Sequence, residues 1–328
     1  MALLEIKNLK LDFLSGDASF RAVDDVSLSL NTGETVCLVG ESGCGKSVTA
    51  LSIARLVPTP PGRYAGGEVL LNGRDVLKMS KGDLCAIRGG VVSYVFQEPS
   101  ASLNPVFRVG NQIKESLKLH RPQKATDAEV IRLLKLVGIP APESRIKDYP
   151  FQMSGGMQQR VMIAMALASE PKLLVADEPT TALDVTIQAQ ILELLRDLKQ
   201  RLGMAILLIT HNLGIVGDMA DRVAVMYAGQ IVELAPAREL LRRPLHPYTT
   251  ALINSVPKLS NEAQRLSAIP GNVPRIGDFP PGCRFYPRCP SAKPECANTM
   301  PALVEAEPGR WVRCLYAKQQ FPHEPAGS

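Results

Sequence analysis

Eight residues near the start of the chain, Gly40 to Ser47, read GESGCGKS and match the pattern of a phosphate-binding loop. Its glycines allow backbone N–H groups to turn inward around phosphates, Lys46 can reach the β and γ phosphates, and the Ser47 hydroxyl can coordinate magnesium. A strand pattern precedes the motif and a helical pattern follows it, so a chance glycine-rich turn is a poor alternative. The residues predicted to contact nucleotide here are Gly40, Ser42, Gly43, Cys44, Gly45, Lys46, Ser47 and Val48.

Two carboxylates end an apolar run, KLLVADEP, from Lys172 to Pro179. Asp177 is placed to hold magnesium, directly or through water, and Glu178 can polarise the water that attacks the γ phosphate. Alone, an apolar strand that ends in two acidic residues is weak evidence. Together with the phosphate loop it predicts nucleotide hydrolysis.

A third motif, QMSGGMQQR, runs from Gln152 to Arg160 and precedes a helical pattern. A serine and two glycines at a helix N-terminus form a second anion-binding cap, whereas an ordinary N-cap would explain the serine but not the paired glycines. The stretch resembles the signature motif of ATP-binding-cassette proteins, usually LSGGQ, with methionines at 153 and 157 as the departures. Ser154, Gly155 and Gly156 are intact.

This resemblance implies that two subunits pack head to tail, so that the cap of one closes on the γ phosphate held by the loop of the other. It also gives roles to Gln97 in SYVFQEP, which contacts magnesium or the attacking water, and to His211 in LLITHN, the switch histidine that contacts the γ phosphate. Thr181 to Asp184, TALD, matches the D-loop of the dimer interface. In the family an aromatic residue near the N-terminus stacks on adenine, and we expect Phe13 to do so. Phe20 is the alternative, because stacking requires only a ring face and both residues supply one.

Alternating strands and helices must hold these motifs. Apolar runs predict buried strands over Glu34–Gly40, Lys172–Asp177 and Met204–Thr210, and helical periodicity follows over Ser47–Leu56, Val185–Leu202 and Leu213–Met219. Period-two segments near the start suggest an antiparallel layer, and residues from about 99 to 160 are expected to form a helical insertion. The fold class is therefore α/β. The resemblance makes it a P-loop NTPase of the ABC ATPase type, with a RecA-like parallel core.

Proline and glycine become dense after about residue 235, so we expect an ATPase domain over 1–235 and a C-terminal extension over 236–328. The extension opens with RRPLHPYTTALINSVP, which is similar to a segment of peptide-importer ATPases. It also carries four cysteines at the spacing C-x5-C-x6-C-x17-C, namely Cys283, Cys289, Cys296 and Cys314.

That cysteine spacing fits neither the paired C-x2-C of common zinc sites nor the bacterial ferredoxin run. Similar subunits bind a four-iron four-sulfur cluster at this pattern, so the resemblance implies that cluster first and structural zinc second. Disulfides are disfavoured in a reducing cytosol, and reduced unligated thiols remain open.

Length and composition limit the role of the chain. Its 328 residues are 45% hydrophobic, which is enough for a large core, and no apolar run approaches the roughly 18 to 20 residues needed to cross a bilayer. Glu5 and Lys7 interrupt any signal-peptide core, so we expect a cytoplasmic protein, peripheral to the membrane. The net charge of +5 is spread among acidic residues and favours no nucleic-acid partner.

These features predict an ATPase that energises di- or oligopeptide import, with ATP and magnesium at its site. The expected partners are a second ABC ATPase that is a related, non-identical chain, two membrane permease subunits and an extracytoplasmic substrate-binding protein. An importer for nickel or another small solute is the nearest alternative. A nucleic-acid-associated ABC ATPase is the alternative of another class, but neither long coiled coils nor a second cassette is present. A redox sensor at the cysteines is a further alternative.

Overall fold

The structure of the protein is a computed structural model that describes residues 2–181, 183–256 and 269–317. The chain divides into two compact units, which we treat separately: residues 1–3, 30–34 and 78–209, and residues 4–29, 35–77 and 210–328. The strands are β1 (Ala2–Ser15), β2 (Ala18–Asn31), β3 (Thr35–Val39), β4 (Gly62–Leu71), β5 (Arg74–Asp75), β6 (Val92–Val95), β7 (Leu173–Asp177), β8 (Ala205–Thr210), β9 (Arg222–Tyr227), β10 (Gln230–Pro236), β11 (Val304–Glu307) and β12 (Arg310–Val312).

Helices alternate with these strands along the chain. The α-helices are α1 (Lys46–Ser52), α2 (Lys81–Ile87), α3 (Pro99–Ser102), α4 (Val109–His120), α5 (Asp127–Leu136), α6 (Pro142–Arg145), α7 (Gly155–Leu167), α8 (Val185–Leu202), α9 (Val216–Met219), α10 (Ala237–Arg242) and α11 (Pro247–Asn254). The short 3-10 helices are η1 (Val76–Lys78), η2 (Pro122–Lys124), η3 (Pro150–Gln152), η4 (Leu213–Ile215), η5 (Tyr286–Arg288) and η6 (Pro294–Ala297).

In the unit that contains residues 78–209, three parallel strands run in the order β6, β7, β8. Strand β7 is LLVAD, apolar until its last residue, and its first four residues are fully buried. Such continuous apolar runs suit strands that are covered on both faces. Strand β6 is a parallel neighbour of β7 that precedes Gln97, and the sequence pattern does not predict it.

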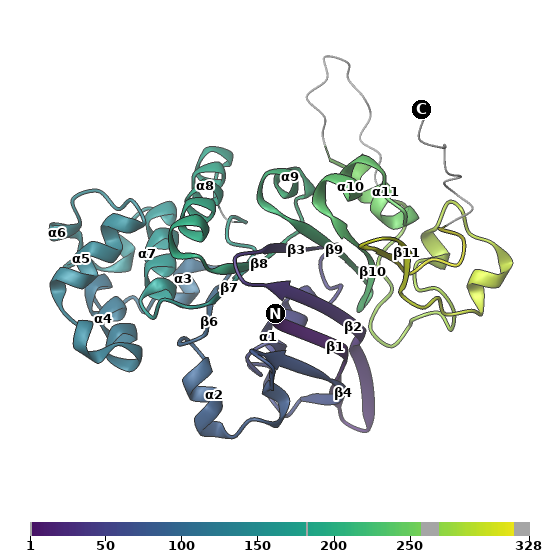
Figure 1. The fold of residues 1–328 in the computed structure, drawn as a ribbon, viewed down its shortest axis with the longest axis horizontal. Coiled ribbons are helices and arrows are strands. Elements are labelled where there is room, and N and C mark those ends of the chain that lie inside the picture. The colour runs from purple at the N-terminus through teal and green to yellow at the C-terminus, as the bar shows by residue number, and fades with distance from the viewer. Residues whose placement is uncertain (1, 182, 257–268, 318–328) are drawn as a thin grey trace, which may run out of the picture. The chain divides into compact units, whose positions relative to one another are not determined.

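The helical insertion packs around α7. This helix is apolar around most of its circumference, so it is buried, and α3, α4 and α5 all contact it. Helices α4 and α5 are instead apolar on one side, which faces inward. Figure 1 shows α4 to α7 gathered into one cluster in blue-green. The expected helical insertion is therefore present.

Helix α8 follows β7 and spans the predicted residues. Asp184 caps its N-terminus by accepting a hydrogen bond from the Ile187 N–H at 2.9 Å, and Gly203 ends it in the left-handed conformation with φ of 64°. Its buried residues, Ile191, Leu195 and Leu198 among them, recur at helical spacing. Local signals thus define both ends and the inward face.

The other unit contains the predicted antiparallel layer. Strands β2, β1, β4 and β5 pair in that order, and the pairs β1–β4 and β4–β5 are antiparallel. In the same unit β3 pairs in parallel with β9, while β9–β10, β10–β12 and β12–β11 are antiparallel. The chain beyond residue 300 thus adds strands to a sheet whose other members lie earlier in the sequence.

The C-terminal region also shares an aromatic core with this unit. Phe285 is 1% exposed, and its ring centroid lies 5.2 Å from that of Tyr227 and 5.3 Å from that of Tyr248. Such tilted and edge-to-face arrangements are favourable for aromatic pairs. The extension therefore gains apolar burial by packing on an aromatic residue from earlier in the chain.

Candidate nucleotide site

The predicted phosphate loop lies between β3 and α1. Gly40 has φ of 154° and Gly45 has φ of 103°, both in the region that favours glycine. A Cβ atom on Gly40 would lie 2.2 Å from the Met226 carbonyl oxygen, so a side chain cannot be accommodated there without movement of the backbone. Close packing therefore requires glycine where the phosphate-loop pattern has it.

The lysine of this loop is held by the loop itself. Lys46 is 5% exposed, and its Nζ donates to the Gly40 carbonyl oxygen at 2.8 Å and to the Glu41 carbonyl oxygen at 3.0 Å. Ser42, Gly43 and Ser47 are exposed, so N–H groups and a hydroxyl are accessible at the same loop. The ammonium group of Lys46 can therefore exchange its two carbonyl partners for the oxygens of a bound phosphate.

Cys44 contributes packing rather than reactivity to this loop. It is 1% exposed, and burial raises the pKa of its thiol despite the neighbouring charge of Lys46. A neutral buried thiol is a poor nucleophile. We therefore assign it no chemical step.

In the other unit, the predicted catalytic carboxylate is brought together with Gln97. Gln97 Nε2 donates to Glu178 Oε2 at 3.3 Å, and Thr181 Oγ1 donates to the same oxygen at 2.8 Å. Glu178 has φ of 46°, and its N–H donates to the Ile209 carbonyl oxygen at 3.0 Å. A left-handed non-glycine residue costs about 1–3 kcal/mol, and such strain clusters at functional sites.

The sequence motif places Thr181 in the D-loop and gives it no role at the carboxylate. Its hydroxyl fixes the orientation of Glu178. The spacing of three residues between Glu178 and Thr181 is the sequence signal for this contact, because it allows a tight turn. In that turn the Thr181 N–H also donates to the Glu178 carbonyl oxygen at 3.3 Å. Ala182, within the same motif, lies outside the described residues.

The residues of the predicted anion-binding cap lie at the start of α7. Ser154 is its N-cap, with the side-chain oxygen accepting from the Met157 N–H at 3.4 Å, and both Ser154 and Gly155 are exposed. A Cβ atom on Gly156 would lie 2.8 Å from Ile187 of α8, whereas one on Gly155 would meet Leu183 at an ordinary 3.6 Å. Packing against α8 thus explains why residue 156 is glycine, whereas the exposed Gly155 is accessible to an external ligand.

This difference predicts unequal effects of two adjacent substitutions. Gly156→Ala should lower the free energy of unfolding by about 1–3 kcal/mol, because overpacking forces α7 and α8 apart. Gly155→Ala should change it by less than about 0.5 kcal/mol. Urea denaturation of both variants measures the difference, and equal destabilisation would contradict this packing argument.

The remaining predicted residues lie at the ends of strands. His211 is exposed directly after β8, and Phe13 and Phe20 are half-buried in β1 and β2. Phe20 packs on the C-terminal region, since a Cβ atom on Gly277 would lie 3.0 Å from its ring. The assignment of an adenine-stacking residue stays a prediction.

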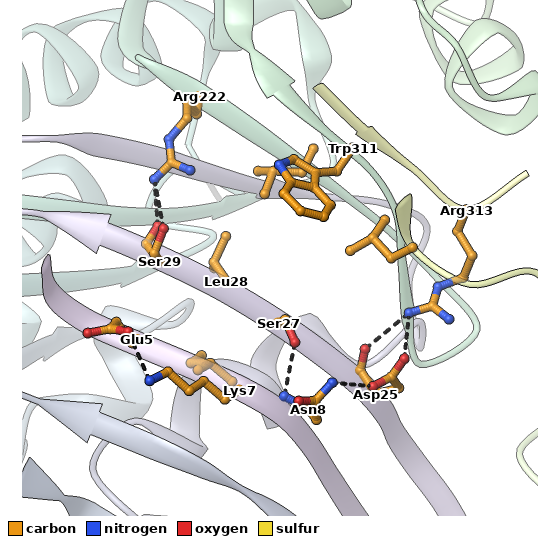
Figure 2. Close-up of a pocket in the computed structure, with 13 residues that line it drawn as sticks. Glu5, Lys7, Asn8, Asp25, Ser27, Leu28, Ser29, Arg222, Trp311 and Arg313 are labelled. Carbon is orange, nitrogen blue, oxygen red and sulfur yellow. Dashed lines mark hydrogen bonds and ion pairs between the residues drawn. The ribbon is translucent and has the colours of Figure 1, made fainter. Parts of the chain in front are cut away.

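A hollow of about 400 Å³ lies elsewhere. Figure 2 shows that Arg313 donates to Asp25, that Lys7 pairs with Glu5 and that Arg222 donates to Ser29. None of the predicted nucleotide-site residues that the structure describes lines it. The motif chemistry, rather than cavity size, therefore identifies the candidate site.

The four C-terminal cysteines line one small cavity together with His246, Phe285 and Tyr316. All four are half-buried and free of disulfides. Burial raises the pKa of Cys289 to about 11, and the neighbouring thiols add to the effect. Within the described ranges, no three Cys, His, Asp or Glu side chains are grouped so as to hold a metal ion. The metal-centre prediction is thus not confirmed.

Across the described residues, no helix combines the length and the apolar character needed to span a membrane.

Comparisons with known proteins place relatives along nearly the whole chain. Residues 23–181 match the family described as ABC transporter, and residues 232–296 match the one described as oligopeptide/dipeptide transporter, C-terminal region. The chain is 50% identical over 320 residues to AppD of Bacillus subtilis, an oligopeptide transport ATP-binding protein, covering 97% of this chain and 98% of that one. It is 48% identical over 318 residues to DppD of Escherichia coli, a dipeptide transport ATP-binding protein, covering 96% and 97%.

Solved structures confirm the predicted fold class. The dimeric ATP-binding cassette MJ0796, in a post-hydrolysis state bound to ADP and Pi, matches with a TM-score of 0.63 and 27% identity, covering 72% of this chain and 99% of that one. CbiO1 from Clostridium perfringens, part of an ABC transporter complex, shares the fold with a TM-score of 0.62 and 24% identity, covering 74% and 91%. The chain therefore belongs to the ABC transporter family of ATP-binding subunits, in the branch that carries the oligopeptide/dipeptide transporter C-terminal region.

Proposed function

We propose that this chain hydrolyses ATP to energise the import of dipeptides or oligopeptides through a membrane transporter. The observation that carries the proposal is similarity over nearly the whole chain, C-terminal region included, to ATP-binding proteins named for oligopeptide and dipeptide transport. The contact of Gln97 and Thr181 with Glu178 supports the hydrolytic part, because it orients a carboxylate that can act as general base.

Each part of the site has one task in the proposed mechanism. The phosphate loop binds the phosphates, with Lys46 transferring its hydrogen bonds from loop carbonyls to the β and γ phosphates. Ser47, Gln97 and Asp177 would hold magnesium, since hydroxyl, amide and carboxylate oxygens suit that ion. Magnesium supplies charge neutralisation when bound. Glu178 accepts a proton from the attacking water, and His211 stabilises the γ phosphate.

A second ATPase subunit is part of this proposal. Ser154 and Gly155 present an exposed helix N-terminus whose N–H groups can receive a phosphate from another protomer. The related cassette MJ0796 is dimeric. We propose pairing with a related, non-identical chain, with a copy of this chain as the alternative.

The membrane subunits would dock beside Gln97. A groove of about 250 Å³ there is lined by Phe96, Met162 and Met165, and Phe96 is 41% exposed although its ring stacks on Tyr94. Of these side chains Phe96 is exposed, and aromatic and methionine side chains are enriched at protein interfaces. We propose that a cytoplasmic segment of a permease subunit occupies this groove, which places the chain at the cytoplasmic face of the membrane. An extracytoplasmic binding protein would deliver the substrate.

Docking can be tested with matched substitutions. Phe96→Asp should reduce co-purification of the chain with its permease subunits at least about tenfold, because it places a charge in an apolar contact. Leu119→Asp, at a 73% exposed position that does not line the groove, is the control and should retain them. Thermal denaturation of both variants checks folding, and equal retention would exclude the groove as the docking site.

The transport proposal is tested by reconstitution into liposomes with the permease subunits and the binding protein. We expect uptake of a labelled di- or tetrapeptide that requires ATP on the side of this chain. Uptake of nickel without peptide uptake would support the alternative importer. ATPase activity that is stimulated by DNA or RNA, without transport, would support the nucleic-acid alternative.

We further propose a four-iron four-sulfur cluster at Cys283, Cys289, Cys296 and Cys314. Their opening onto one cavity supports a common ligand, and structural zinc is the second candidate. Thiolates are the binding form, so the raised pKa of Cys289 means that assembly must release protons.

Anaerobic purification tests the cluster. We expect a brown protein that contains iron and acid-labile sulfide, and Cys314→Ser should lose most of both. Cys85→Ser, at an exposed cysteine outside the group, should retain them. A colourless protein that releases zinc on denaturation would replace the cluster with zinc, and a metal-free protein would contradict both.

A further inference from the structure

Glu41, the second residue of the phosphate loop, is held at three points. Its N–H donates to Tyr248 Oη at 3.0 Å, and its carbonyl oxygen accepts from Lys46 Nζ at 3.0 Å. Its carboxylate accepts two hydrogen bonds from Arg288, at 2.9 and 3.0 Å. Tyr248 and Arg288 both belong to the chain beyond residue 236, so the C-terminal region supplies two of the three contacts.

Arg288 is firmly placed for this contact. Its side chain is 4% exposed, and its Nε donates to the Pro270 carbonyl oxygen at 2.8 Å. A second hydrogen bond runs to Tyr227 Oη at 3.4 Å, with the guanidinium 5.8 Å from the centroid of that ring. A bidentate pair fixes the orientation of both planar groups. The carboxylate of Glu41 is therefore both neutralised and oriented.

The charge of Glu41 matters because of its position. A loop this short keeps Glu41 within roughly one Debye length, about 8 Å at physiological ionic strength, of any phosphate bound to it. An unpaired carboxylate there would repel the triphosphate of ATP. Arg288 removes that repulsion, and Tyr248 holds the backbone of the same residue.

We propose that Arg288 and Tyr248 are positioning residues for the phosphate loop, through which the C-terminal region sets the affinity of the chain for ATP. The inference rests on the proposed role of Gly40–Ser47 in binding ATP. It gives the region that characterises this branch of the family a direct part in the nucleotide site.

The contact also links the loop to the cysteine cavity. Cys289 follows Arg288 directly, and Phe285 lines the cavity while its ring contacts Tyr248. Hydrogen bonds from Tyr286 N–H to Cys283 and from Cys289 N–H to Tyr286 close the intervening turn. The turn that carries two of the cysteines thus also places Arg288.

The test compares the KM for ATP and kcat in the full-length chain. Arg288→Gln should raise the KM for ATP about tenfold and change kcat less than about twofold, because repulsion weakens binding of the ground state and the transition state alike. Arg288→Lys should recover part of the loss, since it restores charge without the bidentate contact. The double variant Arg288→Gln, Glu41→Gln should recover most of it, because the unpaired carboxylate is gone.

Arg284 provides a matched control in the same segment. Its side chain is 8% exposed, and it pairs with Asp24 at 2.6 Å rather than with the loop. Arg284→Gln removes a buried arginine as well, so a general folding defect would raise the KM equally in both variants and overturn the inference. Failure of the double variant to recover would also overturn it. Lys46→Ala tests the underlying assignment: unchanged ATP binding there would refute the phosphate site itself.

Discussion

Glu178→Gln is expected to retain ATP binding and to hydrolyse ATP about 100-fold or more slowly than the unmodified chain. A general base typically contributes a factor of 10² to 10⁴ to the rate, and an amide cannot accept the proton of the attacking water. The amide oxygen can still accept the hydrogen bonds from Gln97 and Thr181 that position the side chain. Binding should therefore survive while turnover is lost.

Phosphate release measures the rate, and titration with a fluorescent ATP analogue measures binding. Glu193→Gln is the control, since Glu193 is an exposed residue of α8 whose ion pair runs to Arg196. It should hydrolyse ATP at the unmodified rate. A Glu178→Gln variant with unimpaired turnover would remove this residue from the catalytic role.

The local features of the site were predictable from the sequence. The strand before the phosphate loop and the strand that ends at Asp177 are continuous apolar runs, and α8 carries both a cap and a helical period. These signals depend on neighbours within a few residues, so they are visible without a structure. The conformations of Gly40 and Gly45 follow from the same loop pattern.

Element ends were less predictable. Helix α1 ends at Ser52 rather than at Leu56, because Ile53 and Arg55 donate to carbonyls three residues back and Arg55 takes the left-handed conformation. The helix expected over 213–219 begins instead as a 3-10 turn, since the side chain of Asn212 accepts from the Gly214 N–H at 2.8 Å. Side chains that bond to nearby backbone groups in this way compete with helical hydrogen bonds, and they leave no periodic pattern in the sequence from which the helix end could be predicted.

Contacts between distant segments were not predictable from one sequence. Strand β6 has only four residues, too few for a pattern, and its burial depends on pairing with β7. The bond between Glu41 and Arg288 joins residues 247 apart in the chain. Composition and spacing identified the cysteines as a group, but not that the arginine beside Cys289 reaches the phosphate loop.

Gly155→Asp is expected to leave folding and ATP binding intact while reducing hydrolysis about 100-fold or more. An acidic residue in the first turn of α7 interacts favourably with the helix dipole, by about 0.3–1 kcal/mol, so the fold should be retained. The same charge would repel a γ phosphate that approaches the exposed cap, and loss of one stabilising donor group already costs about 10² to 10³ in rate. Gly155→Ala, which adds no charge, is the control and should keep most activity.

Where two copies of this chain pair, mixing two inactive variants would show which protomer supplies the cap. In a head-to-tail pair of one Lys46→Ala chain and one Gly155→Asp chain, both defects fall in one site and the other site is intact. If the cap served the loop of its own chain, each site would carry one defect and the mixture would stay inactive. Hydrolysis in the mixture above that of either parent therefore requires a shared site. Full activity of Gly155→Asp alone would contradict any role for the cap in hydrolysis.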